Sequence, residues 1–158
     1  MKSIRRRRST SVVLFAGLAL LFTGPAYGQD AINNSVVKIH VTNREPDFTR
    51  PWAKGTPKQV AGTGVIIEGE RILTNAHVVN YAIRILVQGH QSTERIPARV
   101  LAISPEMDLA LLGIDNDDFF NQRRALQLDS QLPKAKDTIS AYGYPIGGEQ
   151  LSVTEGIV

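Results

Sequence analysis

The sequence predicts an all-β protein made of short strands, arranged as a barrel or a sandwich. Three observations support this class. Apolar and polar residues alternate over runs of four to nine residues, turn-forming residues separate these runs, and no apolar pattern of helical period continues beyond about three turns. The length of 158 residues, with 42% apolar and 21% charged residues, suits one domain or two small ones.

The first strand is predicted over residues 35–41, with apolar side chains on one face and Lys38 and His40 on the other. A mostly polar loop with three prolines follows at residues 42–58. The turn Glu68-Gly69-Glu70 joins the next two strands into a hairpin. These two strands and the later ones are predicted over residues 60–67, 71–74, 83–87, 96–102, 109–114, 138–144 and 151–158.

Composition and charge exclude several functional classes. The absence of cysteine removes disulfide scaffolds, thiolate metal sites and cysteine nucleophiles. The net charge of +3 arises before residue 29, where five of the 18 basic residues lie and no acidic residue occurs. Residues 29–158 carry 13 basic and 15 acidic side chains, so we expect no nucleic-acid partner.

The first 28 residues have the pattern of a signal peptide. Four arginines precede an apolar run of 11 residues, Val12–Phe22, and small residues at Ala26 and Gly28 have the spacing of a signal-peptidase site. The run is shorter than the roughly 20 residues that span a bilayer, which disfavours an uncleaved anchor. We expect cleavage after Gly28 and a periplasmic or secreted protein, and a chain without cysteine suits a periplasm.

Two residues at strand ends could carry chemistry. His77 directly follows a predicted strand, and Asp108 begins the next buried run 31 residues later. An imidazole can take a hydroxyl proton and return it to a leaving group, and a carboxylate on its other nitrogen fixes the tautomer. A lone histidine in a β-rich chain is more often structural, so spacing alone leaves both readings open.

Five short segments of the chain are informative together, and two of them contain His77 and Asp108. They are residues 61–67 (AGTGVII), 74–79 (TNAHVV), 108–112 (DLALL), 141–148 (AYGYPIGG) and 153–158 (VTEGIV). In this order they resemble segments of the Deg/HtrA family of trypsin-like serine proteases, over about residues 35–158. The resemblance implies that His77 is the general base and that Asp108 orients it.

The resemblance also implies a fold and an organisation of domains. The fold would be a chymotrypsin-like double β-barrel with the active site between two six-stranded antiparallel barrels. We expect the signal peptide at residues 1–28, a complete first barrel at 29–130 and only the start of the second barrel at 131–158.

The nucleophile of this family is missing from the sequence. The family places it in a Gly-Asn-Ser-Gly-Gly motif of the second barrel, together with the oxyanion hole and the specificity pocket. No serine after residue 28 has that context; these are Ser35, Ser92, Ser104, Ser130, Ser140 and Ser152. We therefore expect either a fragment of a protease or a truncated gene product, inactive on its own.

Other candidate sites are weaker. His40 and His90 are predicted to be solvated. Asp115–Asp118 is predicted to be a charged turn, because two phenylalanines follow where a calcium loop needs a glycine and a ligand. Trp52 is either a surface contact residue or packed against the barrel. The sequence has no His-Glu-x-x-His zinc signature. Its glycine pairs (Gly62 with Gly64 and Gly147 with Gly148) are expected to serve the backbone rather than a phosphate.

The predicted function is an exported serine endopeptidase of Deg/HtrA type. The resemblance implies unfolded or misfolded proteins as substrates and acyl transfer without metal or organic cofactor. A homo-oligomer and PDZ-type domains further along the protein are left open. The rival hypothesis is a non-catalytic binding protein with a degenerate trypsin-like fold.

Overall fold

The computed structural model describes residues 29–145 and 148–158, and the predicted signal peptide lies outside them. Six strands form a closed antiparallel barrel in the order β1-β2-β3-β6-β5-β4. Its strands are β1 (Val36–Asn43), β2 (Lys58–Ile67), β3 (Arg71–Thr74), β4 (Ala82–Gln88), β5 (Ile96–Ser104) and β6 (Leu109–Ile114). The predicted all-β fold is confirmed.

The barrel closes because β1 pairs along both of its edges. Ile39 lies opposite Gly62 of β2 on one side and Val87 of β4 on the other. Alternate residues therefore point into the barrel, as the period of two in the sequence requires. The core gathers inward-pointing residues from several strands, among them Val37, Ile39, Ile66, Ile72, Val87 and Leu112.

The turn between β2 and β3 is the hairpin predicted at Glu68-Gly69-Glu70. Gly69 and Glu70 adopt φ values of +78° and +55°, a left-handed conformation that glycine takes at no steric cost. Val65 pairs with Leu73 and Ile67 with Arg71, which is the register of a tight hairpin.

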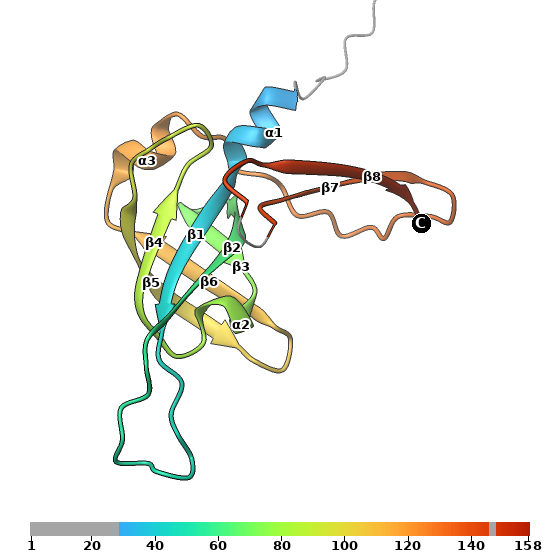
Figure 1. Ribbon diagram of the computed structural model, residues 1–158. Coiled ribbons are helices and arrows are strands. Elements are labelled where there is room, and N and C mark those ends of the chain that lie inside the picture. Colours follow the sequence, from blue (N-terminus) through green and yellow to red (C-terminus); the bar gives the residue numbers. More distant parts are fainter. Residues whose placement is uncertain (1–28, 146–147) are drawn as a thin grey trace, which may run out of the picture.

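A second sheet lies beside the barrel. Strands β7 (Thr138–Gly143) and β8 (Ser152–Ile157) pair with each other and extend away from the barrel as a two-stranded ribbon (Figure 1). Both strands are largely exposed. A closed six-stranded barrel with a separate hairpin is what the chymotrypsin-like expectation requires of a first barrel and the opening strands of a second.

Three short helices complete the described chain: α1 (Gln29–Ser35), α2 (Ala76–Val79) and α3 (Asp117–Asn121). The predicted charged turn at Asp115–Asp118 is therefore wrong in part, because α3 begins at Asp117 and buries Phe119 and Phe120 against the core. No helix within the described ranges is long and apolar enough to cross a bilayer.

The loop between β1 and β2 leaves the barrel at the end opposite α1 (Figure 1). It carries Trp52, which is 82% exposed, so of the two readings of this residue the structure shows the surface position.

Candidate active site

His77 is presented by α2, the single helical turn that follows β3. Ala76, Val78 and Val79 are all less than 9% exposed, and Val78 and Val79 pack into the core. Because the other three residues of this turn face the barrel, the side chain of His77 points outward and is 71% exposed. Burial of its neighbours thus fixes the backbone that carries the imidazole.

Asp108 lies in the turn between β5 and β6, and its N–H donates to the carbonyl of Pro105 at 3.2 Å. Its φ is +52°, which is uncommon for a residue with a side chain and occurs often at functional sites. Strand β6 pairs with β3, with Ala110 opposite Thr74. This pairing brings the residue before β6 next to the residues after β3, across 31 positions of sequence.

The carboxylate of Asp108 receives three N–H groups from two residues. The His77 backbone N–H donates to Oδ1 at 2.9 Å, and Nδ1 of the same residue lies 2.7 Å from Oδ2. The Asn75 amide donates to Oδ2 at 3.1 Å and to the Asp108 carbonyl at 3.2 Å. These hydrogen bonds, first the one from the His77 backbone and then the one from its ring, lower the pKa of Asp108 below its ordinary value of 3.8. The carboxylate is therefore ionised at neutral pH.

A cleft of about 990 Å³ runs from His77 across the outer faces of β1 and β2. It continues to Tyr144 and Glu149, which belong to the segment between β7 and β8. The His77 imidazole thus lies in a cleft that has the barrel on one side and the approach to the second sheet on the other.

The β7–β8 connection is fastened to the barrel by hydrogen bonds. The backbone N–H of Tyr144 donates to Thr63 Oγ1 at 2.8 Å. Lys38 is 4% exposed, and its ammonium donates to the Gly148 carbonyl at 2.7 Å and lies 3.0 Å from a carboxylate oxygen of Glu149. The hydrogen bond and charge of Lys38 lower the pKa of Glu149. The prediction that Lys38 lies on the outer face of its strand is correct, but the β7–β8 connection covers the side chain.

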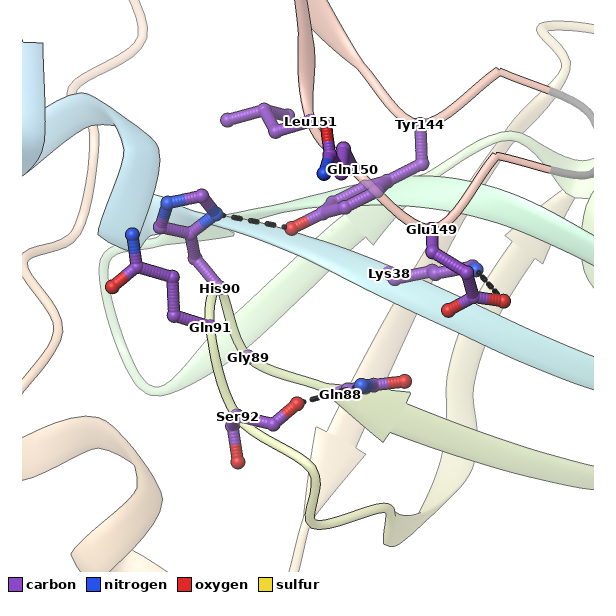
Figure 2. Close-up of a pocket in the computed structure, with 10 residues that line it drawn as sticks. All are labelled: Lys38, Gln88, Gly89, His90, Gln91, Ser92, Tyr144, Glu149, Gln150 and Leu151. Carbon is purple, nitrogen blue, oxygen red and sulfur yellow. Dashed lines mark hydrogen bonds and ion pairs between the residues drawn. The ribbon is translucent and has the colours of Figure 1, made fainter.

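A smaller pocket of about 370 Å³ lies between the β4–β5 turn and the same connection (Figure 2). The His90 ring is 3.4 Å from the Tyr144 hydroxyl across it, and burial raises the pKa of Tyr144. His90 is thus half-buried rather than solvated.

His40 also differs from the expectation of a solvated side chain. Its Nε2 is 2.7 Å from Gln88 Oε1, and burial lowers the pKa of the ring. Neither of these two histidines is in contact with a carboxylate in the manner of His77.

The structure places the two sequence-predicted site residues, His77 and Asp108, in direct contact. Within residues 29–145 and 148–158, no serine hydroxyl is hydrogen-bonded to the His77 ring; the Ser35 hydroxyl, for example, donates to the Ala31 carbonyl. The same part of the chain has no group of three or more side chains suited to a metal ion. Sequence reasoning missed the contacts of Asn75, whose signal was only its place in the TNAHVV segment.

The fold and the paired histidine and aspartate define the class of trypsin-like peptidases. The family described as trypsin-like peptidase domain matches residues 62–158, well over half of the chain. The chain belongs to this family, and its relatives place it in the Deg/HtrA group, which the sequence segments predicted.

Three relatives illustrate the match. The serine protease DegP homolog of Plasmodium falciparum is 43% identical over 123 residues, which are 78% of this chain and 14% of that protein. Protease Do-like 4, mitochondrial, of Arabidopsis thaliana is 39% identical over 79% of this chain and 24% of its own length. A chloroplastic Arabidopsis thaliana protein named for Do-like protease 6 is 39% identical over 99% of this chain and 69% of its own length. The chain spans about a quarter or less of the first two.

Solved structures show the same fold. The Rv3671c protease from M. tuberculosis in its active form superposes with a TM-score of 0.64 at 26% identity, over 81% of this chain and 49% of that one. The HtrA-type protease AlgW with a tripeptide gives a TM-score of 0.64 at 27% identity, over 82% and 37%.

Proposed function

We propose that this chain is the part of a Deg/HtrA-type serine endopeptidase that carries the histidine and the aspartate. The observation that supports this is the contact of 2.7 Å between His77 Nδ1 and Asp108 Oδ2, beside a cleft, in a chain of the trypsin-like family. His77 acts as general base and then general acid, and Asp108 orients it.

The geometry supports this division of roles. Ionised Asp108 accepts a hydrogen bond from Nδ1–H and so leaves the lone pair of Nε2 facing outward, where it can take the proton of an attacking hydroxyl. The carboxylate then stabilises the imidazolium until Nε2 gives the proton to the leaving amine. The 71% exposure of the His77 side chain leaves this nitrogen accessible to the nucleophile and the substrate.

The nucleophile that this proposal requires would be supplied by a longer protein of which these 158 residues are a part. No serine of the described residues is hydrogen-bonded to His77, and the chain spans 14% to 24% of several relatives. We assign residues 1–28 to a signal peptide, 29–130 to the first barrel and 131–158 to the start of the second.

The substrates we propose are peptide bonds of unfolded or misfolded proteins, as part of protein quality control. The structures of HtrA-type AlgW with a tripeptide and with a decapeptide support peptide substrates. Assembly into a homo-oligomer and PDZ-type domains further along the protein belong to the same proposal. Sedimentation of the longer protein tests the assembly.

The compartment we propose is the periplasm or the exterior of the cell. Several relatives are named as mitochondrial or chloroplastic, so the mature N-terminus is the informative measurement. Mass spectrometry of the protein from fractionated cells is expected to find a chain that begins at Gln29 in the exported fraction. An intact residue 1, or a processed chain retained inside the cell, contradicts the proposal.

The catalytic assignment is tested by measuring casein hydrolysis with the longer protein that this proposal implies. We expect His77→Ala to abolish activity and Asp108→Asn to lower kcat by about 10⁴-fold, since the amide imposes the wrong tautomer. His90→Ala, a matched histidine outside the pair, keeps activity. Residues 29–158 alone are expected to be inactive. Full activity of Asp108→Asn refutes the assignment, and hydrolysis by the short chain refutes the external nucleophile.

A further inference from the structure

Asn75 occupies the position before the first residue of α2, where asparagine is favoured because its side-chain oxygen can accept an N–H of the first turn. The backbone is extended there, with φ −80° and ψ 143°, as such a position requires. The Asn75 side chain nevertheless makes no capping hydrogen bond. An explanation other than helix capping is needed for this residue.

Asp108, which lies 33 positions after Asn75, accepts the N–H that a helix-capping side chain would accept. Its Oδ1 accepts the N–H of His77, the second residue of the helix, at 2.9 Å. Asn75 uses the donor end of its amide instead. It directs Nδ2 at both the carbonyl and the Oδ2 of Asp108, at 3.2 Å and 3.1 Å.

These two contacts hold both the backbone and the side chain of Asp108. The backbone has the left-handed φ of +52°, a conformation that aspartate in a turn adopts more often than most other residues with a side chain. One Asn75 hydrogen bond holds the carbonyl of this residue. The other lies on Oδ2, the oxygen that faces His77 Nδ1, so rotation of the carboxylate breaks it.

We propose that Asn75 is a positioning residue, whose amide locks the backbone and carboxylate of Asp108 so that Oδ2 stays directed at Nδ1 of His77. This inference rests on the proposed function for its catalytic consequence, but not for its structural one. Asn75 does not touch the reacting atoms and acts through Asp108.

The His77 tautomer tests the proposal without any need for activity. Nitrogen-15 NMR of residues 29–158 is expected to show neutral His77 protonated on Nδ1 in the unaltered chain. In Asn75→Ala the carboxylate keeps only its two His77 contacts and can turn away from Nδ1 more easily, so the share of the Nε2-protonated form rises. Asn80→Ala, at the other end of α2, is the matched control and keeps the original tautomer. An unchanged His77 tautomer in folded Asn75→Ala overturns the proposal.

Asn75→Asp keeps the test decisive if the alanine variant does not fold. Aspartate suits a helix start as well as asparagine does, but its carboxylate has no N–H to donate and repels Asp108. A role in capping predicts no change in this variant, whereas the positioning role predicts loss of the Nδ1–H···Oδ2 hydrogen-bond signal. Retention of that signal overturns the proposal.

Kinetics of the longer protein separate this inference from the proposed function. We expect Asn75→Ala to lower kcat by about 10²-fold with KM unchanged, the effect of a misplaced catalytic group. If the unaltered protein proves inactive while the tautomer responds as expected, the function fails and the positioning role stands. Unchanged kcat in an active protein overturns the positioning role.

Discussion

Replacement of Gly64 by alanine is expected to destabilise the barrel, because the interior has no room for a methyl group at this position. Gly64 is buried in β2. A Cβ atom there would lie 2.6 Å from Ile72 Cγ2, 2.8 Å from Ile39 Cδ1 and 3.1 Å from Val37 Cγ2. All three neighbours are fully buried, so none can swing into solvent.

The magnitude follows from these distances. Carbon atoms in contact normally lie about 3.5–4.0 Å apart, so the new methyl group is too close to three side chains at once. Overpacking of this kind typically costs about 1–3 kcal/mol. Alanine recovers about 0.4–1 kcal/mol by restricting the unfolded chain. We therefore expect a net loss in the free energy of unfolding of about 1.3 kcal/mol at the middle of these ranges, and of up to about 2.6 kcal/mol.

Thermal unfolding of residues 29–158, followed by circular dichroism, is the assay. For a domain of about 100 residues, 1 kcal/mol corresponds to a change in Tm of ~4–8 °C. Gly156→Ala in β8 is the matched control, because nothing lies within 4 Å of the added Cβ, and it should not lower the Tm. An equal or higher Tm for Gly64→Ala, or an equal loss for the control, refutes the argument from packing.

Three further outcomes are expected. Because hydrogen bonds hold the pKa of Asp108 below its unfolded value of 3.8, this group stabilises the fold above that pH and ceases to do so as pH falls through its lower folded value. The difference in urea stability between the unaltered chain and Asp108→Asn should therefore be largest near neutral pH and shrink in acid; a constant difference contradicts it. Deletion of residues 138–158 should reduce association in sedimentation, since the exposed β7 and β8 edges template pairing; a sharp monomer of the undeleted 29–158 chain contradicts this. Trp52, the sole tryptophan, should fluoresce like a solvated indole and barely change on unfolding; a large blue shift in the folded chain would show that it is covered.

The strands could be predicted because their patterns are local. Alternation of apolar residues placed β1 to within a few residues, and the Glu68-Gly69-Glu70 turn identified the β2–β3 hairpin. The limit of this reasoning appears in β5, where the register shifts between Val100 and Ala102. Such a bulge moves later side chains to the other face, so simple alternation does not describe the end of the strand.

The burial of polar residues could not be predicted, because it depends on segments remote in sequence. Lys38 and His40 lie on the outer face of β1, as alternation requires, but the β7–β8 connection covers Lys38 and Gln88 of β4 contacts His40. Helix α1 was missed for a similar reason. It has no apolar period, and the single O–H of buried Ser35 at its end is shared between the carbonyls of Ala31 and Arg124.

The candidate site also has residues that the sequence predicted and one that it did not. His77 and Asp108 were identified from short segments that resemble a known family, and the β3–β6 pairing brings the two together. The role of Asn75 could not be predicted from the sequence, because asparagine before a helix normally indicates a cap. Only the three-dimensional contact shows that Asp108 accepts the helix N–H in its place.

The two oxygens of the Asp108 carboxylate have different partners. This difference affects which residues a lineage would keep if it lost proteolytic activity. Oδ1 binds the backbone N–H of residue 77, a contact that any residue except proline at that position can make, whereas Oδ2 serves the imidazole. In a lineage that lost proteolysis, selection for folding alone would still favour the aspartate, which ties α2 to the β5–β6 turn. The histidine would be free to drift. We therefore expect non-catalytic descendants of this barrel to lose the residue at position 77 before the one at position 108.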